Sequence, residues 1–489
     1  MKEENLKNKI VNATKWSSIT EIAAKIVSPI TNMILARVIS PEAFGVVATV
    51  TMIFSFADML TDAGFQKYLV QHEFKNNEEK YKCVNVAFWT NLGISFFLWG
   101  VIIFFRNKLA LSVGNPGLGN VIMIACIQLP ITAFSSIQMA LYRRHFDFKT
   151  LLIVRLYLIL IPFIITIPLA LLGFSYWALI IGTICSQLFN AIILTIKSKW
   201  KPKFFYSKEI LIDMLSFSIW SLIEAISIWL TMWVDAFIIG NSLNQYYLGI
   251  YKTSTAMVNT LMSLITASIV PVLFSALSRL QNDSDKFNRM YFNTQRIASV
   301  FIFPLGIGVY LYSDLATKIL LGSKWNEASG VVGIWAFTSA ITIVFGYFSS
   351  EVYRAKGRPK LSFLAQLLHL LVLVPTCIIS SKYGFWPLVY ARSWIRMEFV
   401  VVHLIIMKVA IGIPIIKTIK NVFPAFISAV AMGVLGYLLQ QISKGLLWSI
   451  VSIIICSLFY WGVLYLFSNI RKEMNGILIK LKPRLAKGK

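Results

Sequence analysis

Charged side chains are scarce in this sequence, and their scarcity excludes a soluble globular protein. Asp, Glu, Lys and Arg together make up 14% of the 489 residues, whereas hydrophobic residues make up 57%. A single soluble core of this length cannot bury so much apolar surface, so the excess must face lipid. Apolar stretches of about 18 residues or more, each long enough to cross a bilayer as a helix, recur from near residue 14 to near residue 468. The chain is therefore predicted to lie almost entirely in a membrane.

The sequence has only five cysteines, and it lacks the motifs of metal-dependent and nucleotide-dependent enzymes. The cysteines lie in or beside apolar runs, without CxxC spacing or a nearby histidine cluster, and packing explains them best. No HExxH, GxSxG or Walker A motif stands in a suitable context. We therefore predict that the protein is not an enzyme and that it has no catalytic residue, metal or cofactor. Any energy coupling is expected to come from an ion gradient or from downstream consumption of the product.

The apolar runs also lack the alternation of membrane β-strands, so they predict an all-α integral membrane protein of about fourteen transmembrane helices. Polar, Gly and Pro punctuation sets the boundaries between the helices. The expected spans are 14–39, 42–70, 82–105, 118–142, 151–172, 176–197, 209–236, 247–279, 291–313, 328–353, 359–380, 384–408, 417–441 and 445–468.

Acidic residues are fewer than half as numerous as basic ones, 21 against 46, which gives a net charge of +25. The basic residues lie in short connectors between apolar spans and form no folded basic surface, so no nucleic-acid partner is predicted. With a cytoplasmic N-terminus, only six basic residues fall outside: Arg106, Lys108, Lys318, Lys324, Lys382 and Lys444. The positive-inside rule then predicts a multi-pass protein of the inner (cytoplasmic) membrane with both termini in the cytoplasm. The N-terminal segment lacks the pattern of a removable signal peptide.

Two pairs of segments indicate an internal repeat. WSSITE, from Trp16, aligns with WSLIEA, from Trp220, at an offset of 204 residues, and the same alignment places Phe44-Gly45 opposite Leu248-Gly249. A second pair sets LYRRHFDFK at 141–149 beside VYRAKGRPK at 352–360. Both pairs fall at equivalent positions in the predicted order of helices.

The repeat predicts two pseudo-symmetric six-helix lobes, followed by two more helices. The expected parts are a cytoplasmic N-terminus at 1–13, lobes at 14–199 and 208–408, two transmembrane helices at 417–468 and a basic cytoplasmic tail at 469–489. An even number of helices per lobe keeps both lobes in the same orientation. We therefore expect a pseudo-twofold axis along the membrane normal, a substrate cavity between the lobes at mid-depth, and alternating access by rocking of the lobes.

Several strings in this frame resemble one family of transporters. They are SPEAFG at 40–45, FADMLTDAGFQKYLVQ at 56–71, LYRRHFDFK at 141–149, VDAFIIGNSLNQYYLGIY at 234–251 and VYRAKGRPK at 352–360. With these strings the chain resembles the Wzx-type polysaccharide transporters of the multidrug/oligosaccharidyl-lipid/polysaccharide exporter superfamily, especially their colanic-acid and teichuronic-acid exporter branch.

The resemblance implies a flippase for undecaprenyl-diphosphate-linked oligosaccharide repeat units, which serve capsule, exopolysaccharide or lipopolysaccharide O-antigen assembly. The implied partners are the lipid-linked oligosaccharide, membrane lipid, and a polysaccharide polymerase with its chain-length regulator. Substrate-binding residues are poorly defined across the family, so none is transferred. The alternative is a multidrug and toxin extrusion antiporter, which shares the fold and is coupled to cations.

A flippase of this kind must carry a diphosphate through hydrocarbon, and basic side chains facing a hydrated cavity would stabilise it. The basic candidates within predicted spans are Lys25, Arg37, Lys252, Arg392 and Arg396. Arg392 and Arg396 stand four residues apart near mid-bilayer, which suggests an anion site, although an interhelical ion-pair network with Glu224 or Asp235 is the alternative. Lys25 has an alternative as the partner of Glu21 in an intrahelical ion pair, and Arg37 and Lys252 as side chains that reach the outer interface.

Acidic and aromatic residues complete the candidate set. The acidic groups that could bind a coupling cation or pair with the basic ones are Glu21, Asp58, Asp62, Glu224 and Asp235. The deeper tryptophans, which could stack on sugar rings, are Trp220, Trp229, Trp233 and Trp394, with packing as the alternative.

Overall fold

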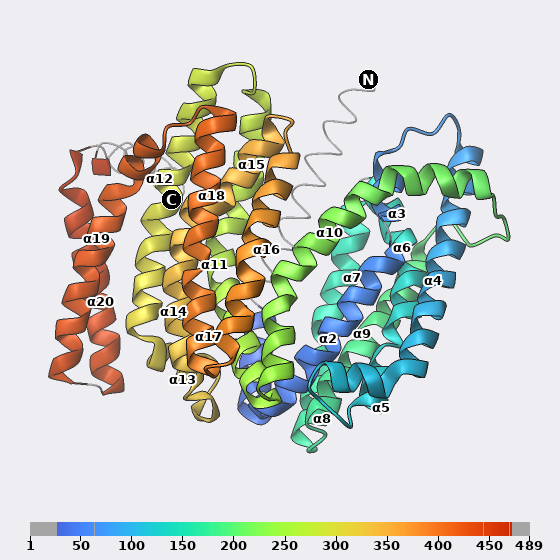
Figure 1. Ribbon diagram of the computed structural model, residues 1–489, viewed down its shortest axis with the longest axis horizontal. Coiled ribbons are helices and arrows are strands. Elements are labelled where there is room, and N and C mark those ends of the chain that lie inside the picture. Colours follow the sequence, from blue (N-terminus) through green and yellow to red (C-terminus); the bar gives the residue numbers. More distant parts are fainter. Residues whose placement is uncertain (1–26, 63, 146, 444, 469, 472–489) are drawn as a thin grey trace, which may run out of the picture. The chain divides into compact units, whose positions relative to one another are not determined.

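The computed structural model describes residues 27–471 except positions 63, 146, 444 and 469, and it leaves out the side chains of 217–221, 268, 271, 272 and 275. Throughout this described part the regular structure is helical and no strand occurs (Figure 1). Eleven helices in it are long and apolar enough to cross a membrane. The all-α membrane fold predicted from composition is therefore confirmed, while the count of fourteen spans stays a prediction.

The helices follow one another in the order of the predicted spans. Residues 27–38 are helical. The elements of the first half are α2 (Pro41–Asp62), α3 (Phe65–Gln71), α4 (Asn77–Ser112), α5 (Gly119–Ala125), α6 (Gln128–Arg144), α7 (Phe148–Ile161), η1 (Pro162–Thr166), α8 (Ile167–Leu171), α9 (Tyr176–Lys197) and α10 (Lys208–Ser242). Those of the second half are α11 (Gln245–Arg279), α12 (Ser284–Leu311), α13 (Ser313–Leu320), η2 (Ser323–Trp325), α14 (Ala328–Thr342), η3 (Ile343–Tyr347), α15 (Phe348–Ala355), α16 (Lys360–Ser381), α17 (Phe385–Trp394), α18 (Arg396–Ile406), η4 (Met407–Ile411), α19 (Ile415–Ile442) and α20 (Leu446–Tyr465).

Several predicted spans are broken where the backbone leaves the α-helical path. The span 42–70 ends at Asp62, because Gly64 adopts a left-handed conformation that starts the separate helix α3. The span 151–172 contains the π-helix η1, which begins at Pro162, a residue without an amide hydrogen to donate. The span 384–408 is interrupted at Ile395, between α17 and α18. Hydrophobicity alone predicts the length of a span and gives no signal for these breaks.

The chain divides into two compact units. Among the described residues, unit 1 comprises those up to Thr253 together with Leu320–Trp325 and Val374–Leu388, and unit 2 comprises Ser254–Ile319, Asn326–Leu373 and those from Val389 onward. In unit 1, α6 packs against α4 and α9, and α10 packs against α2. In unit 2, α12 packs against α14 and α19, and α20 packs against α19 at the end of the chain (Figure 1). These units are defined by compactness, whereas the predicted lobes at 14–199 and 208–408 are defined by the internal repeat. The division into lobes stays a prediction.

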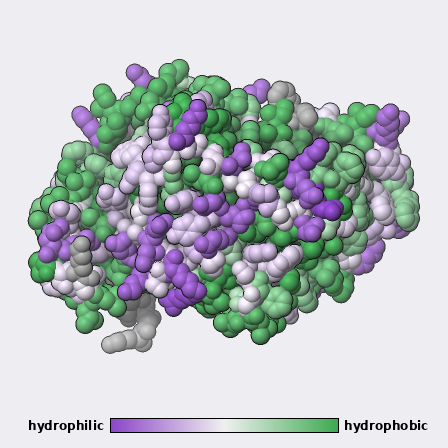
Figure 2. Space-filling view, turned by 60° about the horizontal axis from the view of Figure 1, so that its bottom comes forward, coloured by the Kyte–Doolittle hydropathy of each residue, from purple (hydrophilic) through white to green (hydrophobic). Residues whose placement is uncertain are grey.

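Large apolar side chains remain on the outside of the protein. Hydrophobic residues cover broad areas of the face shown in Figure 2. Among the exposed hydrophobic residues of the described part, Phe104, Leu447 and Val409 are each about four-fifths exposed. Exposure of this kind is unfavourable in water, and it fits helices that are surrounded by lipid.

The repeat-related glycines of unit 1 make a reciprocal contact between α2 and α11. A Cβ added to Gly45 would collide with the backbone carbonyl of Gln245, and a Cβ added to Gly249 would collide with the backbone carbonyl of Pro41. The offset of 204 residues that aligns the two repeats maps Pro41 onto Gln245 and Gly45 onto Gly249. The contact therefore maps onto itself when the two repeats are exchanged. Glycine is required on both sides because the two backbones approach too closely for a side chain.

Candidate substrate-binding site

The candidate site is built on α14 in unit 2, which begins the most buried membrane span among the described residues, Ala328–Ala355. Its apolar residues pack in the core, while Thr338 and Thr342 satisfy their hydroxyl groups by donating to backbone carbonyls one turn earlier. Trp335, on the same helix, is almost fully buried and donates its indole N–H to Oδ1 of Asn259 over 3.2 Å. That hydrogen bond fixes the orientation of the ring.

Arg392 and Arg396 lie together over this tryptophan. Cζ of Arg396 is 4.3 Å from the centroid of the Trp335 ring, and Cζ of Arg392 is 5.2 Å from it. Nη1 of Arg396 also donates to Oγ of Ser339 over 2.8 Å and to Oγ1 of Thr338 over 3.3 Å. Both guanidinium groups thus lie on one aromatic face, and that of Arg396 also donates to two hydroxyl groups of α14.

The helix is interrupted at Ile395, between the two arginines, and this interruption places them on different helices. Arg392 belongs to α17, which ends at Trp394, and Arg396 opens α18. The amide of Glu398 donates to the carbonyl of Ile395 over 3.0 Å, which tightens the backbone at the junction. An anion bound at this ring would accept charge-assisted hydrogen bonds from both guanidinium groups.

The other basic candidates take separate positions in the described part of unit 1. Lys252 donates to the carbonyl of Met232 over 3.0 Å, and its Nζ lies 4.1 Å from the centroid of the Trp233 ring. Arg37 is exposed and lies beside Gly322. Lys25 and Glu21 lie outside the described residues. The structure therefore brings Arg392 and Arg396 together and places Lys252 and Arg37 in two other environments.

The acidic candidates are engaged with neighbours in unit 1. Asp235 is buried and accepts a hydrogen bond of 2.7 Å from the Tyr251 hydroxyl. The remaining contacts are Thr132 Oγ1 to Asp58 Oδ1 at 2.9 Å, the Gln66 amide to Asp62 Oδ1 at 3.4 Å, and Lys67 Nζ to Glu224 Oε2 at 4.0 Å. Each of these groups thus has a protein partner, in line with a structural role.

The deeper tryptophans have different surroundings. Trp229 donates to Oγ of Ser55 over 2.9 Å and packs against Phe56. Trp233 lies under Lys252, and Trp394 is half exposed next to Phe337. The side chain of Trp220 lies outside the described residues. A stacking role for these rings stays a prediction.

Two functional candidates escaped the sequence analysis, namely Trp335 as the platform of the arginine pair and the histidine of α16. His369 is the one acidic or basic residue in the largely apolar stretch 361–381. Its Nδ1 lies 2.8 Å from Oε2 of Glu398 on α18. A histidine in the middle of an apolar span is itself a signal of function. The partner of that histidine follows only from the packing of the helices.

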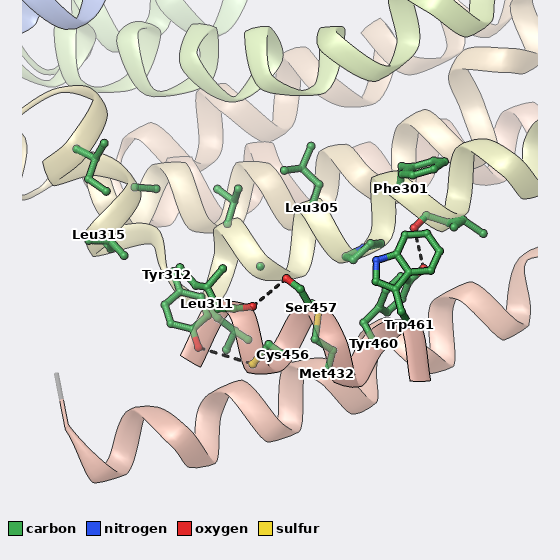
Figure 3. A pocket seen from close by; sticks show the side chains of 17 residues that line it. Phe301, Leu305, Leu311, Tyr312, Leu315, Met432, Cys456, Ser457, Tyr460 and Trp461 are labelled. Atoms are coloured by element: carbon green, nitrogen blue, oxygen red, sulfur yellow. Dashed lines mark hydrogen bonds between the residues drawn. The ribbon is translucent and has the colours of Figure 1, made fainter. Parts of the chain in front are cut away.

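A cavity of about 450 Å³ lies between α12, α13, α19 and α20 in unit 2 (Figure 3). Its lining is apolar except for a few groups such as Tyr312 and Tyr460. The Tyr312 hydroxyl donates to Oγ of Ser452 over 2.9 Å, and the Tyr460 hydroxyl donates to the carbonyl of Val300 over 2.7 Å. Among the described residues that line it, none is a Lys or Arg that could bind an anionic group, so this cavity is not the candidate site.

Comparison with known proteins gives matches to proteins of polysaccharide biosynthesis. The family model described as "Polysaccharide biosynthesis protein" matches residues 34–330. The succinoglycan biosynthesis transport protein ExoT of Rhizobium meliloti is 24% identical over 326 residues, which cover 67% of this chain and 65% of the relative. The lipopolysaccharide biosynthesis protein WzxC of Escherichia coli is 20% identical over 384 residues, which cover 77% of this chain and 76% of the relative. These matches confirm the predicted Wzx-type family.

A solved structure shares the fold. The lipid II flippase MurJ, in an inward closed conformation, superimposes with a TM-score of 0.75 at 17% sequence identity, covering 92% of this chain and 98% of that one. At this identity the similarity concerns the arrangement of helices alone. Together with the apolar helices, these relatives establish a multi-pass membrane protein.

Proposed function

The chain belongs to the family of polysaccharide biosynthesis proteins, and on this premise we propose that it is a flippase for lipid-linked oligosaccharide units. The substrate class is an oligosaccharide joined through a diphosphate to undecaprenol, moved across the cytoplasmic membrane for capsule, exopolysaccharide or O-antigen assembly. The proposed topology has both termini in the cytoplasm. A polysaccharide polymerase and a chain-length regulator are the proposed partners downstream.

The observation that carries this proposal is the pair of arginines on Trp335. Moving the substrate requires a favourable environment for the diphosphate inside hydrocarbon, since unpaired charges are costly there. Arg392 and Arg396 supply two cations, and their neighbours on α14 are an aromatic ring and hydroxyl groups. A guanidinium group can bind a phosphate through two parallel hydrogen bonds. In the proposed mechanism the arginine pair holds the diphosphate while access alternates between the two sides of the membrane.

Deletion of the gene in a strain without a paralogue tests the proposed function. We expect loss of the surface polysaccharide together with accumulation of the lipid-linked repeat unit inside the cell, measured by lipid extraction and mass spectrometry. Complementation with the wild-type chain should restore both. Normal polymer output in the deletion strain would overturn the proposal.

A multidrug and toxin extrusion antiporter is the weaker alternative. The relatives reported above bear names from polysaccharide pathways, and the candidate site is cationic, whereas a transporter of organic cations would favour acidic groups in its cavity. Sensitivity to cationic drugs on deletion, with polymer output unchanged, would select this alternative.

Two replacements of Trp335 are expected to reduce export by different amounts. Trp335→Leu removes the aromatic surface under both guanidinium groups, each cation–π contact being worth roughly 0.5 to 2 kcal/mol. We expect export to fall about tenfold, whereas Trp335→Phe should retain most of it, as measured by polymer output normalised to protein abundance in the membrane. Equal export from Trp335→Leu and the wild type would show that the ring does not support the arginines.

A further inference from the structure

A buried histidine and a glutamate are joined beside the arginine pair in unit 2. Nδ1 of His369, on α16, lies 2.8 Å from Oε2 of Glu398, on α18. The His369 side chain is 4% exposed and that of Glu398 is 25% exposed. The pair therefore has one member sealed in the helix bundle and one that reaches the surface of the protein. A proton entering through Glu398 can be shared along the hydrogen bond with His369.

Two basic residues lie close along the chain to the glutamate of this pair. Arg396 opens α18 two residues before Glu398, and Arg392 lies in the last turn of α17, four residues earlier than Arg396. Phe399 lies against both histidines, with ring centroids 5.0 Å from His369 and 4.3 Å from His403. No residue of α14 is ionisable.

The second histidine of this group is also buried. His403 is 1% exposed, and its Nδ1 lies 3.1 Å from the hydroxyl of Tyr353 on α15. That hydroxyl also lies 3.3 Å from the backbone carbonyl of His403, to which it can donate. Nε2 of His403 has no hydrogen-bond partner among the described residues. Phe399 lies between His403 and the hydrogen-bonded pair of His369 and Glu398. A proton on His369–Glu398 therefore affects His403 only electrostatically.

We propose that His369 and Glu398 form a proton-binding site whose occupancy is linked to anion binding at Arg392 and Arg396. The inference rests on the proposed function, because the anion is the diphosphate of the substrate. A bound diphosphate brings negative charge next to the pair, and negative charge nearby favours the protonated form of a titratable group.

Linkage makes this effect reciprocal. If the anion raises the proton affinity of the pair, the proton raises the anion affinity by the same factor. The sign of the pH dependence follows from the charges. Binding of the anion is accompanied by uptake of protons, so the affinity for the anion rises as the pH falls. An intramembrane histidine with a carboxylate partner is a recurrent proton site in transporters. In this proposal, protonation of the His369–Glu398 pair is coupled to binding of the diphosphate.

The test uses the full chain purified in detergent, with undecaprenyl diphosphate as the probe. Between about pH 8 and about pH 6 we expect the affinity of the wild type to rise about tenfold more than that of His369→Gln or Glu398→Gln. The probe's own titration contributes equally to all three proteins and cancels in this comparison. Addition of the probe to weakly buffered wild-type protein should take up protons, and the uptake should be smaller in both variants.

The outcomes separate this inference from the proposed function. Equal pH slopes and equal proton uptake in the wild type and both variants would overturn the proton site, even where Arg396→Gln loses the probe. Unchanged probe binding by Arg396→Gln would overturn the diphosphate site itself, and the linkage with it. If His369→Gln is not monodisperse in size-exclusion chromatography, the proton-uptake measurement on Glu398→Gln decides, because that residue is partly exposed and its replacement is nearly isosteric.

Discussion

Replacement of Arg392 and Arg396 together by Ala is expected to abolish export of the polysaccharide while the protein still inserts in the membrane at wild-type abundance. Hydrogen bonds to charged groups contribute about 1.5 to 3 kcal/mol each. Loss of two such interactions corresponds to roughly 10²- to 10⁴-fold weaker stabilisation of the diphosphate. The measurement is polymer output, together with the amount of lipid-linked repeat unit that accumulates inside the cell.

Two control variants sharpen this experiment. Arg392→Lys with Arg396→Lys keeps both charges but loses the planar guanidinium groups, so it should retain partial activity. Lys286→Ala removes an exposed basic residue whose partner, Asp283, lies on the same turn, and it should export normally. Wild-type export from the double alanine variant, at equal abundance, would remove the arginine pair from the mechanism.

The second large effect is expected at the reciprocal glycine contact of α2 and α11. Gly45→Ala or Gly249→Ala places a methyl group against a backbone carbonyl of the opposite helix. Overpacking of this kind costs about 1 to 3 kcal/mol, which outweighs the roughly 0.5 to 1 kcal/mol that Ala gains over Gly within a helix. Each variant should therefore unfold at a lower temperature in detergent, as followed by circular dichroism.

The pair of glycines also predicts non-additivity. One separation of the two helices relieves both collisions, so the double variant should lose less stability than the sum of the single variants. Gly93→Ala and Gly100→Ala are matched controls, because both lie in helix α4 and a Cβ at either meets no atom within 4 Å. They should be neutral or slightly stabilising. Unfolding temperatures of Gly45→Ala and Gly249→Ala equal to those of the controls would contradict the close approach.

Sequence predicts the parts of this fold that depend on composition and misses those that depend on the path of the backbone. The helices are predictable because long apolar runs without the alternation of membrane β-strands can cross lipid only as helices, which pair their own backbone groups. The left-handed backbone at Gly64 and the tightened turn at Ile395 are local choices between a continuous α-helix and a departure from it. Such a choice depends on packing against other helices. These contacts involve residues far apart in the sequence, so a short segment of the sequence does not reveal them.

The candidate site was predictable to a similar extent. Depth along the span singles out Arg392 and Arg396 as intramembrane cations, and the structure places them together on one ring. The ring belongs to α14, more than fifty residues earlier in the sequence, and nothing in the periodicity of either helix indicates which faces meet. The bond of His369 to Glu398 was missed for the same reason, since its two members come from different helices.

The glycine contact also bears on how such a chain could arise. A surface in which position 41 meets position 249 and position 45 meets position 245 is self-complementary. Two copies of a single ancestral repeat could pair through it as a symmetric homodimer, with the twofold axis passing between the glycines. Gene duplication and fusion would then keep this pairing without the need for a new interface. Both copies would have to retain glycine at the contact for as long as the pairing persists.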